Sequence, residues 1–322
     1  MWRRNSLGLA LASLFLVGCA ARRSAANEYD RIIWTADWSA DGRIAIGGNQ
    51  GTLRIYPASL SGRPRVVPVA GTVTNVAWHP TRDLLAVAVQ GGAEPGFLVR
   101  GSGEALTSLD SVSPDGARGI AWSASGDRLA VADNDGYLTL YDAGGSMLRR
   151  RRVDPKGATA LGWHPSGDRI DIVGSAWHSY YPGPDSLVSR NFRTEPTLLL
   201  TADWNPKGDI LALGDYGEPD NGVPTQLQFR DAADSLVLLD AGSRAEYRNV
   251  RWDPEGKVLA AAAGGVSLWD ADGLLLAHVL RDRYVWGLGW NADGSRLVVT
   301  TGDGEAFLLD RYLEILRRIR KP

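Results

Sequence analysis

Aspartate recurs at one kind of position along this 322-residue chain: in short polar segments, most often beside glycine. Such a series of carboxylates could suggest a ring of calcium sites. A calcium loop needs several oxygen ligands that converge within one loop, and none of these segments has that spacing. Asp and Gly are also residues that tight turns prefer. We therefore predict turn residues, and no metal site, at Asp41, Asp83, Asp127, Asp168, Asp209 and Asp293.

Histidine, the commonest acid–base residue of enzymes, is scarce in this sequence. The four histidines are His79, His164, His178 and His278, and the first two are each followed by proline. No GxSxG nucleophile elbow, HExxH pair or paired-cysteine site occurs in the chain. The sequence therefore predicts no catalytic residues and no cofactor, and it argues against an enzyme.

The single cysteine, Cys19, ends an N-terminal segment that begins with two arginines and continues with an apolar run to Val17. This is the order of a secretory signal, and the run is too short to span a bilayer. The tetrapeptide Leu16–Cys19 resembles the lipobox of bacterial lipoproteins, in which the cysteine is acylated and becomes the first mature residue. The resemblance implies a signal peptide over 1–18, a lipidated tether over 19–30 and, from Ala20, an outer-membrane protein that faces the periplasm.

An ordinary signal peptide with a chance cysteine is the alternative interpretation of this segment. In either case one cysteine excludes an internal disulfide. A formal net charge of −2 and a pI near 6.1 give no electrostatic reason to expect nucleic-acid binding. The hydrophobic content of 44% and charged content of 22% are those of an ordinary globular protein.

Behind the recurring aspartates lies a repeat that is aligned by tryptophan. Its copies are spaced by 40, 44, 41, 41, 48 and 38 residues, and the clearest reads AWSASGDRLAVADNDGYLTLY. Each copy alternates apolar and polar residues up to the tryptophan, then has a Gly/Asp turn, a second apolar run, another glycine turn and a third run. A looser fourth segment follows. The seven tryptophans are Trp38, Trp78, Trp122, Trp163, Trp204, Trp252 and Trp290.

Four short antiparallel strands every forty residues are typical of one propeller blade, because a lone four-stranded sheet must bury both faces against neighbours. The chain resembles the WD-repeat family over roughly residues 30–320, although the Trp-Asp dipeptide is literal only at Trp269-Asp270. The resemblance implies an all-β, seven-bladed β-propeller over 31–320, monomeric, with Tyr312 to Ile319 as its last outer strand. The Gly-His dipeptide of the family is absent, so its buried hydrogen-bond network is not carried over.

The copies differ most after their second strands. The fifth copy has the long segment GDYGEPDNGVPTQ, and in the fourth GSAWHSYYPGPDSLVSRNFRTEP replaces a compact turn and a clean third strand. These copies are neighbours, so we expect the insertions to adjoin on one rim and to expose side chains that bind a partner. Alternatively, the aromatic residues pack the loop onto its blade. The candidate residues are Trp177, His178, Tyr180, Tyr181, Asp215, Tyr216, Glu218, Asp220 and Asn221.

Two further features have competing interpretations. The basic runs at 149–152 and 317–321 either protect exposed sheet edges or contact anionic lipid headgroups. Arg283, Tyr284 and Trp286 enter the seventh copy as a second possible contact point, with Trp286 expected at a blade interface.

Taken together, these features favour a lipid-anchored, non-catalytic propeller that binds a protein or peptide partner in the bacterial envelope. The alternative is a periplasmic propeller enzyme, a metal-dependent lactonase or hydrolase, with its site at the channel mouth.

Overall fold

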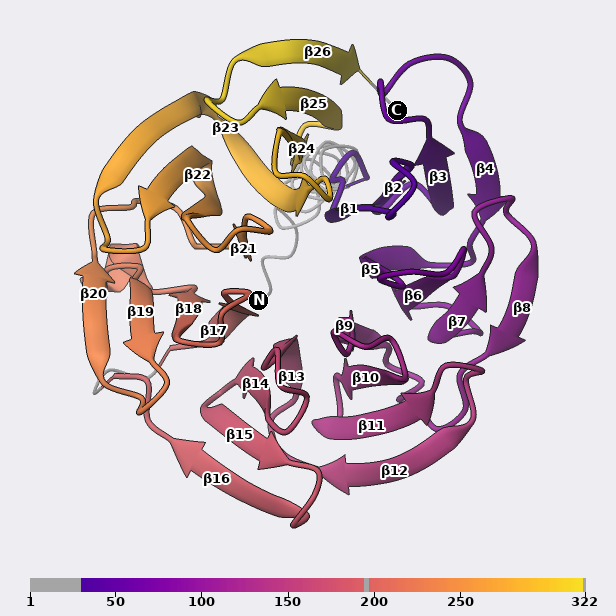
Figure 1. Cartoon of the computed structure of the whole chain (residues 1–322), viewed down its shortest axis with the longest axis horizontal. Helices are drawn as coiled ribbons and strands as arrows, with labels where there is room; N and C mark the ends of the chain where they lie inside the picture. The colour runs from indigo at the N-terminus through magenta and orange to yellow at the C-terminus, as the bar shows by residue number, and fades with distance from the viewer. Residues whose placement is uncertain (1–29, 194–196, 321–322) are drawn as a thin grey trace, which may run out of the picture.

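The computed structural model describes residues 30–193 and 197–320, which form an all-β ring of antiparallel sheets (Figure 1). Within each sheet the strands are hydrogen-bonded in chain order, with the first strand nearest the ring axis and the last at the perimeter. The prediction of an all-β fold built from repeated four-stranded antiparallel sheets is confirmed.

The strands follow the sequence repeat. The first sheet holds β1 (Thr35–Trp38), β2 (Ile44–Gly47), β3 (Thr52–Tyr56) and β4 (Arg65–Pro68). The second holds β5 (Thr72–Trp78), β6 (Leu85–Gln90), β7 (Gly96–Val99) and β8 (Ala105–Ser108). The third holds β9 (Ala117–Trp122), β10 (Arg128–Asp133), β11 (Tyr137–Asp142) and β12 (Met147–Arg152). The fourth holds β13 (Ala158–Trp163), β14 (Ile170–Gly174), β15 (Trp177–Tyr181) and β16 (Ser186–Arg190).

The fifth sheet holds β17 (Leu199–Trp204), β18 (Ile210–Asp215), β19 (Leu227–Asp231) and β20 (Leu236–Asp240), with a short 3-10 helix, η1 (Pro219–Asn221), between β18 and β19. The sixth and seventh sequence copies form one six-stranded sheet. It holds β21 (Asn249–Trp252), β22 (Val258–Asp270), β23 (Leu275–Trp290), β24 (Arg296–Thr301), β25 (Glu305–Asp310) and β26 (Ile315–Arg320). The predicted count of seven separate four-stranded blades is therefore not confirmed.

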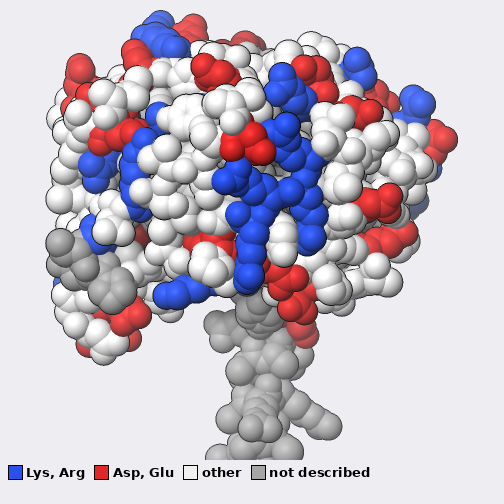
Figure 2. All heavy atoms as spheres, turned by 90° about the horizontal axis from the view of Figure 1, so that it is seen from below, with Lys and Arg blue, Asp and Glu red and all other residues white. Residues whose placement is uncertain are grey.

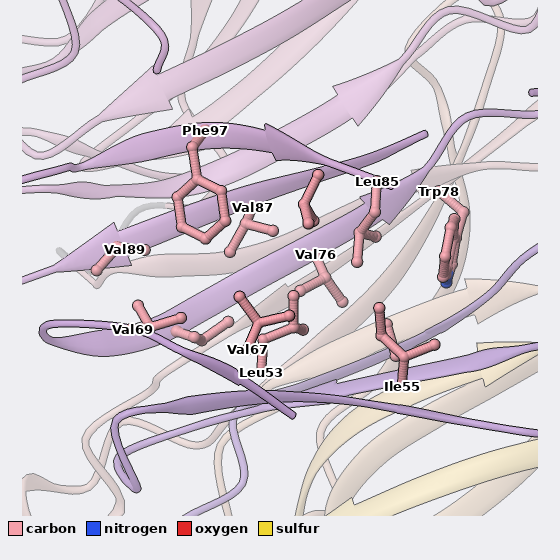
Figure 3. Close-up of a cluster of buried hydrophobic side chains, with 13 residues drawn as sticks. Leu53, Ile55, Val67, Val69, Val76, Trp78, Leu85, Val87, Val89 and Phe97 are labelled. Carbon is pink, nitrogen blue, oxygen red and sulfur yellow. The ribbon is translucent and has the colours of Figure 1, made fainter. Parts of the chain in front are cut away.

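The core lies between neighbouring sheets. Figure 3 shows the cluster between the first two, where Leu53, Ile55 and Val67 meet Val76 and Val87. These side chains come from alternating strand positions, so each sheet buries apolar residues on both faces. This arrangement explains why the second strands read as nearly continuous apolar runs.

The repeated tryptophans join one sheet to the next, as predicted for inter-blade packing. All seven are buried, with exposed fractions of 5–8%. The indole Nε1 of Trp122 donates to the carbonyl of Ala77 at 3.0 Å, and that of Trp163 donates to Ala121 at 3.1 Å. His79 is bound in the same way, since its Nε2 lies 2.9 Å from the carbonyl of Gly126 in the next sheet. These aromatic residues stabilise the ring.

Most of the predicted turn aspartates accept hydrogen bonds within their own turns, whereas Asp83 accepts from Arg43 and the Gly101 N–H. Asp127 accepts hydrogen bonds from Ser123 and Ser125, and Asp41 accepts one from Ser39. Gly126 closes the turn before Asp127 with a φ of +73°, and a Cβ there would come within 2.4 Å of the His79 ring. Only glycine satisfies both the positive φ and the close approach.

The ring closes where β1 packs against β23 and β24. Ile33, Ala36 and Trp38 share a buried cluster with Val298 and Leu308. Thr300 Oγ1 donates to the carbonyl of Ile33 at 3.0 Å. The last outer strand is β26, as the sequence predicts, and closure rests on contact between the sheet faces.

The outer strands carry the basic runs. Figure 2 looks onto the perimeter of the ring and shows a continuous band of basic side chains with acidic side chains beside it. Arg149 and Arg151 on β12 pair with Asp185, and Arg150 lies 3.6 Å from the ring centre of Tyr137. These contacts hold the arginines along an edge strand, where charge opposes pairing with another sheet.

The predicted signal peptide and Cys19, and all of the tether except Asp30, lie outside the described residues. In the part of the chain that the structure describes, no helix has the length and apolar composition needed to span a bilayer.

Candidate functional site at the ring axis

The seven first strands converge on one cavity at the ring axis, which we call the central cavity. Its volume is about 70 Å³. Every copy contributes the residue four positions before its tryptophan, so the lining is a ring of sequence-equivalent positions with different side chains. These seven residues are Trp34, Thr74, Arg118, Thr159, Leu200, Arg248 and Trp286.

β-bulges aim these side chains at the axis. The pairing of the first with the second strand skips one residue at Thr74, Arg118, Thr159, Leu200 and Trp286. A bulge leaves the extra residue out of the ladder and redirects its side chain. In the other two copies the pairing stops at Thr35 and Asn249, one residue after Trp34 and Arg248.

The cavity lies at one face of the ring, which we call the entry face. The chain enters each first strand on this face, so with four antiparallel strands the connection from the second to the third strand lies on it as well. The connections from the third to the fourth strand lie on the opposite face.

Two of the cavity arginines stack on aromatic rings. The Arg118 guanidinium lies 5.5 Å from the ring centre of Trp34, and that of Arg248 lies 4.2 Å from Trp286. Both indoles belong to one aromatic pair, with ring centres 4.7 Å apart. Stacking of this kind orients a guanidinium while its edge stays available for hydrogen bonds.

The polar contacts of these side chains are unevenly filled. Arg248 forms an ion pair with Glu246, yet its Nε is buried with no hydrogen-bond partner in the structure. The neighbouring Asn249 Oδ1 is also buried without a partner. Buried polar atoms are normally satisfied, so these two atoms mark a place where a ligand or water would bind.

The position just before each tryptophan, three residues after the cavity position, holds a second set of side chains. Four copies have Ala or Gly here, whereas Asp37, Asp203 and Arg251 are charged. Asp37 Oδ2 accepts a hydrogen bond from the Trp78 N–H at 2.7 Å, and Asp203 Oδ2 accepts one from Trp252 at 2.8 Å. Burial raises the pKa of each carboxyl to about 6, against the lowering effect of the Arg251 charge.

A wider groove of about 520 Å³ adjoins the central cavity on the entry face. Arg118 and Thr159 line both. The groove runs over the turns of the second to fourth sheets, where Gln90, Asn134 and Lys156 supply polar groups. An extended ligand in the groove would therefore reach the central cavity at Arg118.

The structure corrects the predicted aromatic loop of the fourth copy. Trp177, His178 and Tyr180 do not lie in an exposed loop: they belong to β15, with exposed fractions of 2%, 5% and 1%. Tyr181, at the end of the strand, is partly buried. The pairing of β15 with β14 and β16 supplies the third strand that the sequence interpretation had missing.

Buried polar partners explain this strand. His178 Nε2 lies 3.2 Å from Asp154 Oδ2, and its Nδ1 lies 2.8 Å from Ser189 Oγ. Trp177 Nε1 donates to Asp171 Oδ1 at 2.7 Å. These partners come from separate strands and turns, and their hydrogen bonds offset the cost of burying a polar sequence in the core.

The predicted residues of the fifth copy divide into buried and exposed. Asp215 is fully buried and accepts hydrogen bonds from Arg193 and the Gln226 N–H. The remaining four lie in the exposed β18–β19 connection on the entry face: Tyr216, Glu218, Asp220 and Asn221. The insertions of the fourth and fifth copies do adjoin, because Arg193 Nη1 of the fourth donates to Asp215 Oδ2 at 2.7 Å and to the Pro224 carbonyl at 2.8 Å.

Trp286 lines the central cavity and also contacts both neighbouring repeat copies, through Trp34 and Arg248. The ring of cavity residues was missed by sequence reasoning, although the signal was present. Alignment on tryptophan places Arg118 and Arg248 at one repeat position and Arg251 at another.

Within residues 30–193 and 197–320, no group of three or more His, Cys, Asp or Glu side chains is placed to hold a metal ion. Arginine, tryptophan, threonine and asparagine dominate the polar lining of the central cavity. The arrangement suits recognition of a bound group.

Residues 76–166 match the family model described as the anaphase-promoting complex subunit 4 WD40 domain. No curated protein matches the chain. The matched stretch runs from β5 to the turn after β13, and thus contains the whole third sheet. The match over this stretch and the repeated four-stranded sheets fit WD40-like repeats, the family that the sequence resembles.

Proposed function

We propose that this chain is a lipid-anchored, non-catalytic propeller of the bacterial envelope that binds a protein partner on its entry face. WD40 domains commonly bind protein partners, and a rigid ring with varied connections is suited to this task. The observation that carries the proposal is the ring of seven equivalent cavity positions, which holds two arginines, two tryptophans, two threonines and a leucine and adjoins an open groove.

The partner surface that we propose differs from the one expected from sequence. It combines the central cavity, the groove and the exposed connection that holds Tyr216, Glu218, Asp220 and Asn221. Tyr216 links the parts, because its ring lies 5.9 Å from the Arg248 guanidinium of the cavity. The buried residues of β15 support this surface and are not exposed to a partner.

The lipid anchor bears on which face meets the membrane. Arg31 and Ile32 lie against the β2–β3 turn, where Gln50 donates to the Arg31 carbonyl and the Asn49 N–H donates to Ile32. The chain therefore enters the ring on the entry face. A tether from Ala20 to Asp30 spans at most about 40 Å, so an acylated Cys19 would hold the entry face near the membrane.

We infer that the six-stranded sheet corresponds to two blades, which gives a seven-bladed, monomeric ring. β22 pairs with β21 through its first half and with β23 through its second half. Ser267 Oγ lies 3.5 Å from the Ala261 carbonyl, so the two halves lie side by side. Gly265, with a φ of +106°, lies at the reversal between them.

The partner surface is tested by photo-crosslinking in intact cells with p-benzoylphenylalanine at Tyr216. The matched control is the same substitution at Tyr312, another exposed tyrosine, which lies in the β25–β26 turn on the opposite face. We expect one defined protein crosslinked from Tyr216 and absent from Tyr312. Equal products from both positions, or a product from Tyr312 alone, would contradict the proposed surface.

The anchor is tested separately with Cys19→Ser. We expect the variant to leave the membrane fraction while its propeller folds, as judged by circular dichroism. A variant that still pellets with membranes to the same extent would overturn the lipid anchor and leave the partner surface standing.

A further inference from the structure

We propose that the central cavity binds one small anionic group, a carboxylate or a phosphate. This inference deepens the proposed function, because the group would be presented by the protein partner on the entry face.

Three arginines line the central cavity. Arg118, Arg248 and Arg251 come from two different repeat positions of two distant sheets, yet line one cavity of about 70 Å³. A guanidinium presents several N–H donors in a planar fork, which matches the oxygens of carboxylate and phosphate. Three such groups around one space would surround a single anion.

Arg248 keeps an N–H donor that a ligand can use. Glu246 accepts from Nη2 of Arg248, while Arg248 Nε stays buried and unpartnered. The indole of Trp286 stacks on this guanidinium at 4.2 Å and fixes its plane. A guanidinium held flat with a desolvated N–H is pre-organised for an acceptor and would lose little entropy on binding.

The volume of the central cavity suits a small anionic group. A cavity of about 70 Å³ corresponds to roughly five water-sized positions. This space admits a carboxylate or a phosphate. The adjoining groove, which shares Arg118, would hold the chain that bears the anionic group.

The surrounding charges predict how pH affects binding. Arg251 on β21 acts on the carboxylates of Asp37 on β1 and Asp203 on β17, and Glu246 pairs with Arg248. Burial raises the pKa of Asp37 and Asp203 to about 6, so both become neutral as the pH falls below 6. The arginines keep their charge, and the attraction for an anion increases.

Isothermal titration calorimetry on the full purified chain in detergent tests the proposal with three probes: inorganic phosphate, inorganic sulfate and a pentaglutamate peptide. We expect at least one of the phosphate and peptide probes to bind at one site. Tighter binding of the peptide would identify an acidic side chain of the partner as the source, and tighter binding of phosphate a free or phosphorylated group. Absence of binding by all three would overturn the proposal.

The residue assignment is tested with Arg118→Ala and Arg248→Ala, each of which should weaken binding by about tenfold or more. The control is Arg128→Ala, because Arg128 lies in an exposed ion pair at the start of β10 on the opposite face. Arg118→Lys and Arg248→Lys keep the charge and should bind with intermediate affinity. Equal affinity of the Arg118, Arg248 and Arg128 variants would contradict the assignment.

The pH response gives a readout that a general loss of structure would not produce. Sulfate has a constant charge between pH 7.5 and 5.5, and its affinity should rise by about tenfold over this range. Asp37→Asn with Asp203→Asn should bind tightly throughout and lose the dependence. If anions bind and crosslinking at Tyr216 captures no partner, the anion site is supported and the proposed partner binding is overturned. If Tyr216 captures a partner and no anion binds, only the anion site is overturned.

Discussion

The third and fourth sheets are neighbours with the same strand pattern and different interiors. In the third, Ala130 on β10 pairs with Leu140 on β11, and both are apolar. In the fourth, the equivalent pair is Asp171 on β14 with Ser179 on β15. The backbone registers correspond, so one strand geometry is compatible with either an apolar or a polar interior.

The fourth sheet maintains its geometry through a buried network centred on Asp171. This carboxylate accepts hydrogen bonds from Trp177 and Trp204 at 2.7 Å each and from Ser179 at 2.5 Å. Arg169 forms an ion pair with it at 2.9 Å and a second ion pair with Asp234 of the fifth sheet at 2.7 Å. The network thus replaces apolar packing with contacts that join two sheets.

The fold of the third sheet therefore depends on its own local sequence pattern, whereas the fold of the fourth sheet depends on partner residues from other elements. Each apolar residue of β11 satisfies the same pattern in any blade. Each polar residue of β15 requires a particular partner from another element, and a misplaced partner would cost more than a lost apolar contact.

The largest loss of stability is expected when the acidic residue of the fourth sheet is placed at the equivalent position of the third, with Ala130→Asp. Ala130 is fully buried among apolar side chains, so the carboxylate would have neither an ion-pair partner nor water. We expect a loss of more than about 4 kcal/mol in the free energy of unfolding, measured by urea denaturation. A loss below about 1 kcal/mol would refute the view that only the fourth sheet accommodates a charge here.

The reciprocal change, Asp171→Ala, should cost about 3–5 kcal/mol, because it leaves two buried indole N–H groups without their acceptor and removes one of the two carboxylates that pair with Arg169. The control is Asp127→Ala, which removes an exposed turn carboxylate. Denaturation curves of similar midpoint for the two variants would show that the buried network is not required.

A smaller effect is expected at His178, which is equivalent to Thr139 of the third sheet. His178→Ala should cost about 1–3 kcal/mol because Asp154 loses a buried partner, whereas Thr139→Ala should cost less. Although burial opposes it, hydrogen bonds from His178, the Lys156 N–H and Ser175 lower the pKa of Asp154 to about 2.

The sign of the pH effect follows from that lowered pKa. The stabilisation from Asp154 is complete above its unfolded pKa near 4 and is lost as the pH falls from 4 to 2. Thermal unfolding of the wild type should therefore show a decline in this range that is shallower in His178→Ala. An identical decline in both proteins would contradict the role of the histidine.

The smallest effect should be shared by both sheets. Asp127→Ala and Asp168→Ala each remove a carboxylate that accepts from a serine in the first turn. Each should cost about 0.5–1 kcal/mol, with equal shifts in midpoint. A large difference between them would show that the two sheets also differ in their turns.

The cavity residues show where sequence reasoning stopped. Alignment on tryptophan gave the strands, and it placed Arg118 and Arg248 at equivalent positions. It did not show that a bulge at Arg118 directs the side chain inward, because bulges depend on how two strands pair. The four predicted contact residues in the β18–β19 connection are exposed because Gly, Pro and charged residues there disfavour burial.

Four features could be predicted from the sequence alone: the repeat, the order of the four strands, the buried tryptophans and the turns with Asp and Gly. All of these depend on period-two patterning and turn chemistry within a few residues. Only the tertiary structure decided that WHSYY forms the buried strand β15, and that Arg118, Arg248 and Arg251 meet at the ring axis. The physical reason is the same for both: buried polar side chains are stable only where distant segments supply their partners, and closure of the ring brings those segments together.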